Sequence, residues 1–69
     1  MEELNVFVMR ALRACSKTTH NKELWMHQAF GAIQYHVTVF PEDYEEVSAY
    51  WAKMKPLFER EIYGIVLRV

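Results

Sequence analysis

The sequence predicts an all-α domain in which three helices span about residues 3–16, 22–39 and 42–63. Two of these segments carry apolar residues at a helical spacing, the third is apolar except for one narrow polar stripe, and a polar loop and a tight proline turn separate them. With 69 residues the chain forms one domain, residues 1–69. A chain of this length buries only about 60% of the surface that its unfolded state exposes, so its margin of stability is thin without a partner.

The first helix is predicted by a one-sided apolar stripe. The stripe consists of Leu4, Phe7, Val8, Ala11, Leu12 and Cys15. Acidic Glu2 and Glu3 come at its start and basic Lys17 at its end, which is the order that the helix dipole favours. The polar segment SKTTHNK then predicts a loop, with Thr19 or Asn21 as the N-cap of the next helix.

The prediction of the second helix, residues 22–39, depends on whether its apolar residues follow the period of a strand or that of a helix. The segment YHVTVF (residues 35–40) is rich in β-branched and aromatic residues, as strands are. At a helical period, however, the least apolar positions fall on one stripe, formed by His27, Gly31, Gln34 and Thr38. We therefore predict a helix that is apolar nearly all round and is buried by neighbours on several sides.

The third helix, residues 42–63, is expected to begin just after Pro41 and to stop at Gly64. Its apolar stripe is Tyr44, Val47, Trp51, Met54, Phe58 and Ile62. The stripe keeps its phase across Pro56, which predicts a kink near this proline rather than a new helix. The tail, residues 65–69, is either flexible or a short strand.

An α+β fold is the structural alternative. Residues 35–40 and 65–69 would then be strands, joined by the helix over residues 42–63 in a β-α-β crossover.

Composition narrows the classes of function. Eight Lys and Arg against nine Asp and Glu give a formal charge of −1, a poor match to the basic surface that nucleic acid requires. One cysteine and three histidines without metal-ligand spacing predict no metal site, and we expect neither a cofactor nor a catalytic residue. Cys15 is in phase with an apolar stripe and near the negative end of a helix, so we expect a buried structural thiol. The sequence therefore predicts a protein that is not an enzyme.

The sequence also bears on location. The acidic start lacks the basic region of a secretion signal, and no apolar run approaches the ~20 residues that span a membrane. We expect a cytoplasmic protein without a membrane partner.

Ten aromatic residues and four methionines are many for so small an interior, which predicts that some form an interface. The candidate interface residues are Trp25, His27, Gly31, Gln34, Thr38 and Tyr50. Gly31 beside Ala32 would let another helix approach closely, although the polar stripe is equally consistent with simple exposure to solvent.

A second candidate surface is the acidic patch of Glu42, Asp43, Glu45 and Glu46. Acidic residues at a helix start are commonly no more than a solvated, dipole-favoured terminus. The alternative is a patch that docks a basic partner or mimics nucleic-acid phosphates.

Several short segments carry a resemblance. At QAFGA (residues 28–32), Phe40-Pro41, Trp51 and FEREIYG (residues 58–64), the chain resembles small uncharacterised proteins of phages and integrative elements of Gram-positive bacteria. The resemblance covers roughly the C-terminal two thirds. It implies a small helical accessory protein that binds a host or phage protein, and it carries over no functional residue.

These observations predict a non-enzymatic helical module that forms a homo-oligomer and binds a protein partner of unknown identity. The alternative is a nucleic-acid-related regulator, either a helix-turn-helix-like reader or an acidic decoy. The small basic cluster Arg10, Arg13 and Lys17 argues against the reader, because it lies on the first helix rather than on a recognition helix.

Overall fold

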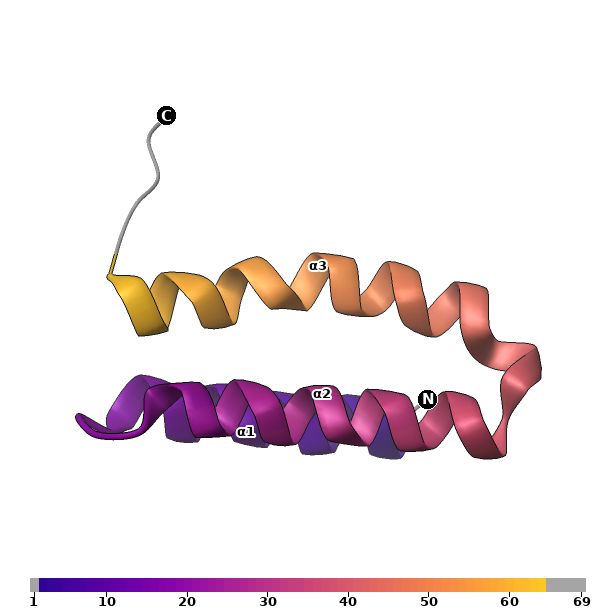
Figure 1. The fold of residues 1–69 in the computed structure, drawn as a ribbon, viewed down its shortest axis with the longest axis horizontal. Helices are drawn as coiled ribbons and strands as arrows, with labels where there is room; N and C mark the ends of the chain where they lie inside the picture. The colour runs from indigo at the N-terminus through magenta and orange to yellow at the C-terminus, as the bar shows by residue number, and fades with distance from the viewer. Residues whose placement is uncertain (1, 65–69) are drawn as a thin grey trace.

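The computed structural model describes residues 2–64, which form three helices in an up-down-up order (Figure 1). Helix α1 spans Glu2–Lys17, α2 spans Lys22–Val39, and α3 spans Tyr44–Tyr63 after a short 3-10 helix, η1, at Pro41–Asp43. The predicted all-α fold and its three helices are confirmed, each end to within two residues. The predicted alternatives for residues 65–69 lie outside the described residues.

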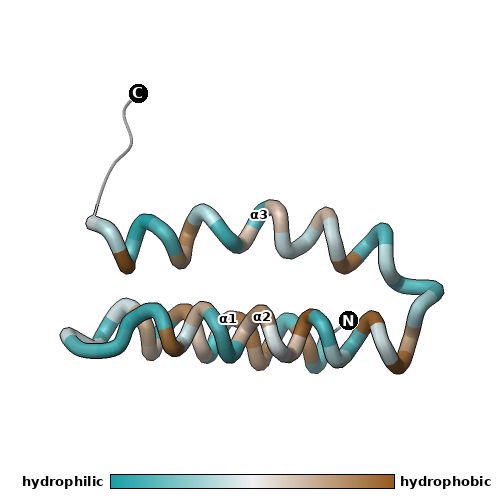
Figure 2. The backbone as a smooth tube through the Cα atoms, in the orientation of Figure 1, coloured by the Kyte–Doolittle hydropathy of each residue, from teal (hydrophilic) through white to brown (hydrophobic). Residues whose placement is uncertain are grey.

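Helices α1 and α2 lie side by side, and α3 runs along one side of this pair and contacts both helices (Figure 1). The connections are short, so each helix runs antiparallel to the next. Figure 2 shows hydrophilic residues at the two turns, one between α1 and α2 and the other around η1. The hydrophilic turns therefore mark the two ends of the bundle.

Helix α1 follows from its apolar stripe. Its buried residues are Leu4, Val8, Ala11 and Cys15, all members of the predicted stripe. Phe7, another member, is 40% exposed instead. It lies on the edge of the stripe, where α1 has no further neighbour among the described residues.

The turn between α1 and α2 differs from the predicted cap. Asn21 is the N-cap residue, but its backbone is left-handed (φ 55°) and its side chain makes no capping hydrogen bond. Asparagine tolerates this conformation, and its carbonyl accepts the N–H of Leu24 at 3.0 Å. Lys22 closes the turn from the other side, because its Nζ donates to the carbonyl of Cys15 at 2.7 Å.

Helix α2 continues through residues 35–39, so the alternative of a strand over residues 35–40 is wrong. Its last turn is held by the Phe40 N–H, which donates to the carbonyl of His36 at 2.7 Å. Burial of α2 on several sides is also wrong, since only Ala29 and Ile33 are buried. Two neighbouring helices cover two sides of α2, half-bury Trp25, Met26, Ala32 and Val37, and leave its other large apolar residues exposed.

Helix α3 is one helix from Tyr44 to Tyr63, with Pro56 inside it and exposed. Its buried residues are Val47, Met54 and Phe58. It ends at Gly64, as predicted, with a left-handed backbone (φ 64°) and an N–H that donates to the Arg60 carbonyl at 2.9 Å.

The core holds nine buried residues, all apolar, and no polar or charged residue of the described chain is buried. The side chains of Val8, Cys15, Val47 and Phe58 are the largest that are fully enclosed. Trp51 packs its ring against Phe58 with the centroids 5.9 Å apart. Within residues 2–64, no helix combines the length and the apolarity needed to cross a membrane.

Candidate interaction surfaces

The predicted polar stripe lies entirely in solvent. His27, Gly31, Gln34 and Thr38 are all exposed along α2. The Thr38 hydroxyl donates to the carbonyl of Gln34 one turn earlier, at 2.8 Å. A Cβ added to Gly31 would meet nothing within 4 Å, so the expected notch is open.

Two residues of this stripe line a groove between α2 and α3. The groove has a volume of about 310 Å³ and is lined by Met26, His27, Phe30, Gly31, Trp51 and Lys55. Phe30 and Trp51 meet across it, with their ring centroids 5.7 Å apart. The site is apolar along its length and carries an imidazole and an ammonium group that an acidic partner could contact.

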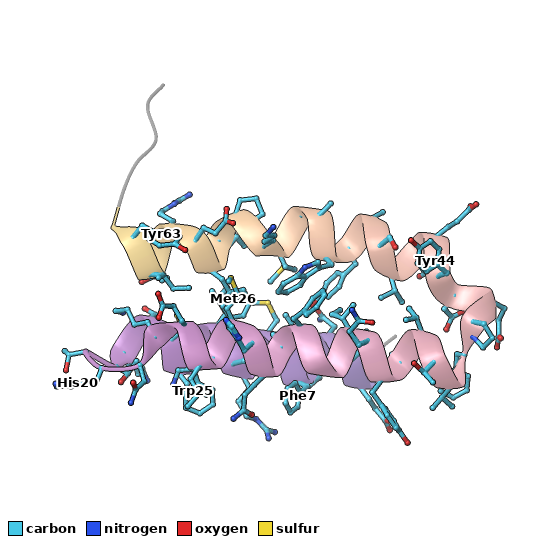
Figure 3. All side chains as sticks on the ribbon, viewed as in Figure 1. Phe7, His20, Trp25, Met26, Tyr44 and Tyr63 are labelled. Atoms are coloured by element: carbon cyan, nitrogen blue, oxygen red, sulfur yellow. The ribbon has the colours of Figure 1, made fainter. Side chains whose placement is uncertain are left out.

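A second apolar surface lies on the side of α1 and α2 that faces away from α3, where Figure 3 shows Phe7 and Trp25. Trp25 is half-buried against the core. Tyr35 follows Leu24 by about three turns and Val39 follows Trp25 by about four, which places these residues on one side of α2. We call this surface the outer face; it consists of Phe7, Leu24, Trp25, Tyr35 and Val39.

The outer face was found only in part from the sequence, which singled out Trp25. Leu24, Tyr35 and Val39 are 53%, 71% and 46% exposed. Periodicity cannot separate these residues from buried ones, because α2 is apolar nearly all round and only its neighbours decide which side is covered.

Tyr50 occupies a different place from the one predicted. It is half-buried, and its hydroxyl donates to Asn5 Oδ1 at 2.7 Å. Burial raises the pKa of this phenol. Tyr50 therefore joins α3 to α1 and does not belong to the same surface as the stripe or the outer face.

The acidic patch is larger than the sequence indicated, because α1 begins beside the start of α3. A hollow of about 420 Å³ is lined by Glu2, Glu3, Leu4, His36, Phe40 and Asp43. Asp43 Oδ2 lies 2.9 Å from His36 Nε2, and the Phe40 ring packs on His36 with centroids 5.0 Å apart. Glu42, Glu45 and Glu46 are exposed, and with Asp43, Glu2 and Glu3 they form what we call the acidic end.

Cys15 is fully buried, as predicted, and its Sγ lies 3.6 Å from the Lys22 carbonyl. Burial raises the pKa of the thiol; nearby Lys22 opposes this effect and Glu61 adds to it. A thiol that resists ionisation is a poor nucleophile. Across residues 2–64, His, Cys, Asp and Glu form no group of three that could hold a metal ion.

The described surfaces thus offer apolar contact and separated charge. Searches of protein-family models, curated proteins and solved structures find no match to this chain.

Proposed function

We propose that this protein is a non-enzymatic interaction module that self-associates and binds a protein partner. One observation carries the proposal. Within residues 2–64 the chain buries nine apolar residues and leaves ten large ones more than a third exposed. Single exposed apolar residues are ordinary on a protein surface, but gathered ones mark an interface.

The exposed residues are gathered on α2 and the corner that follows it. Half of the ten lie between residues 24 and 40: Leu24, Phe30, Tyr35, Val39 and Phe40. A helix with apolar residues on every side is stable in water when other helices cover those sides. The chain supplies two such helices, and a further copy or partner would supply the rest.

The groove between α2 and α3 supports the second half of the proposal. It has the form that takes the apolar side of an amphipathic helix, with Phe30 and Trp51 as contacts for successive turns. His27 and Lys55 at its margin favour a partner helix with acidic flanks. An accessory role in a phage or mobile element, implied by the sequence resemblance, is part of the same proposal.

Light scattering behind a sizing column tests self-association, over about a hundredfold range of protein concentration. We expect a mass of two or more chains that falls toward one chain on dilution. A single-chain mass at every concentration would contradict self-association.

Affinity capture from a host lysate tests the groove, with Phe30→Ser compared against Leu57→Ser. Leu57 is also exposed but does not line the groove. We expect a partner that is captured by the native chain and by Leu57→Ser and lost with Phe30→Ser. Equal capture by both variants would remove the groove from the proposal.

A further inference from the structure

We infer that a second copy of this chain docks on the outer face in an antiparallel orientation. The acidic end of each copy then meets Lys17 of the other. The inference rests on the proposed self-association and adds its surface and its geometry. Three observations carry it: an apolar surface over two helices, an ordered row of charges on that surface, and the separation of charge along the whole molecule.

The outer face is an uncovered apolar surface that spans two helices. Phe7 comes from α1 and the other four residues from α2; Phe7 and Trp25 lie on the side opposite α3 (Figure 3), and helical spacing places the others beside Trp25. No buried or ion-paired charge lies among them, and Tyr35 is the most exposed of the large apolar residues. Covering this face would bury aromatic side chains, which contribute most to such interfaces.

Charged residues flank Phe7 on α1 in a fixed order. Glu3, Phe7, Arg10, Ala14 and Lys17 follow one another at spacings of three and four, which places them in one row of the helix. The row begins with an acidic residue, which an aromatic residue follows. Two basic residues come after these, with the small Ala14 between them. Against its own reverse, such a row places Glu3 opposite Lys17 and Phe7 opposite Ala14, with Arg10 opposite its own copy at the centre.

The acidic residues of the whole molecule gather mainly at one end, while Glu23, Glu59 and Glu61 lie nearer the other end with the basic residues. Six of the nine acidic residues belong to the acidic end, at the start of α1 and around η1. No Lys or Arg occurs in residues 2–9 or between residues 23 and 52. Lys17 and Lys22 lie around the turn at the opposite end, and Arg60 lies in the last turn of α3 at that same end.

Symmetry then selects the orientation. Two identical faces stack about a two-fold axis in the plane between them, which runs either along the helices or across them. The axis along the helices brings acidic end against acidic end. The axis across the helices reverses one copy, stacks α1 on α1 and α2 on α2, and brings the acidic end against Lys17.

In α2, Ala32 lies midway between Trp25 and Val39, so a small residue lies near the centre where the two helices approach each other.

Carbodiimide cross-linking tests the orientation, because this reagent joins a lysine amine directly to a carboxylate. Glu3 and Lys17 lie near opposite ends of α1, about 21 Å apart along its axis. A direct bond between them therefore reports two copies, and an isotopically mixed sample identifies it by mass spectrometry. We expect a dimer that yields the Glu3–Lys17 peptide.

Two tyrosine variants give the matched control. Tyr35→Ser removes a ring from the outer face, whereas Tyr63→Ser removes another well-exposed ring from the end of α3 (Figure 3). Both side chains are too exposed for the fold to depend on them, which circular dichroism would check. We expect Tyr35→Ser to raise the dimer dissociation constant at least about tenfold and to abolish the cross-link, and Tyr63→Ser to do neither.

The outcomes separate this inference from the proposed function. A dimer without the Glu3–Lys17 peptide, or one that Tyr35→Ser leaves intact, would overturn the antiparallel outer-face arrangement while self-association stands. A single-chain mass at all concentrations would overturn both. A cross-linked dimer that Tyr35→Ser alone dissociates would establish the inference.

Discussion

At the scale of single residues, Cys15 shows how a buried group ties stability to pH. The buried thiol has a raised pKa, so the folded chain holds its proton more tightly than the unfolded chain does. The stability that the thiol contributes is complete below its unfolded pKa, about 8.5, and is lost as pH rises through the folded value. We therefore expect the urea midpoint to start falling above about pH 8.5. Cys15→Ala should remove this part of the fall, and an equal fall in the variant would show that other groups cause it.

Tyr50 and Asn5 form the one polar side-chain contact between α1 and α3 among the described residues. Tyr50→Phe keeps the ring and removes only the hydroxyl that donates to Asn5 Oδ1. We expect a loss of about 0.5–1.5 kcal/mol in the free energy of unfolding, since the contact is partly open to water. Asn5→Ala should cost little more once Tyr50 is Phe. Strictly additive losses in this double-mutant cycle would mean that the two side chains do not interact.

At the scale of elements, the two glycines predict effects of opposite sign. Gly64 ends α3 in a left-handed conformation, and an alanine there would be strained even though the space is open. We expect Gly64→Ala to destabilise the fold by about 1 kcal/mol. Gly31 is inside α2 with nothing near its missing Cβ, so Gly31→Ala should stabilise the fold by about 0.5–1 kcal/mol. Thermal melts of both variants would check the pair, and a shared sign would contradict the reasoning.

One polar side-chain contact between the described residues spans the corner between α2 and α3. His36 lies in the last turn of α2 and Asp43 in η1, and their 2.9 Å contact spans the corner that contains Pro41. We expect Asp43→Ala to lower the unfolding free energy by about 1 kcal/mol. The control is Glu42→Ala, because exposed Glu42 makes no hydrogen bond or ion pair with residues 2–64. Equal losses in chemical denaturation would assign the effect to helix-start charge alone.

The elements themselves were largely predictable, for identifiable reasons. The stripe of α3 keeps its phase across Pro56 and ends at Gly64, so both its continuity and its end followed from spacing. In α2 the polar stripe outweighed the β-propensity of residues 35–40, and the helix indeed continues to Val39. The missing cap of Asn21 could not be predicted, because spacing does not reveal a left-handed backbone where an N-cap usually has an extended one.

Neighbours were harder to predict than elements. Periodicity shows which residues share a side of a helix, but it does not show how many other helices exist to cover that side. With only α1 and α3 available, α2 exposes Tyr35 and Val39, and Tyr50 points to α1 instead of to solvent. The candidate interface from the sequence was therefore divided among the groove, the outer face, the solvent-exposed stripe and the contact between α1 and α3.

At the scale of the whole molecule, antiparallel helices turn a local charge pattern into a global one. Each helix begins at the end of the bundle where the previous one stops, so acidic starts of α1 and α3 come together. The sequence patch at Glu42–Glu46 thereby gains Glu2 and Glu3, which are remote in sequence. Short loops already imply this arrangement, so the full acidic end could have been inferred from the sequence once three helices were assigned.

The separation of charge predicts the sign of the salt dependence of assembly. In the antiparallel dimer, Glu3 of each copy faces Lys17 of the other, and salt screens this attraction over a Debye length of about 10 Å at 0.1 M. A single exposed ion pair stabilises the dimer only slightly, but the two-fold axis makes every pair occur twice. We therefore expect the dissociation constant of the dimer to rise roughly three- to tenfold between low and high salt. Glu3→Gln with Lys17→Gln should flatten this dependence, as sedimentation equilibrium would measure. A parallel dimer brings like charges together and would instead tighten as salt is added, so the direction of the change distinguishes the two arrangements.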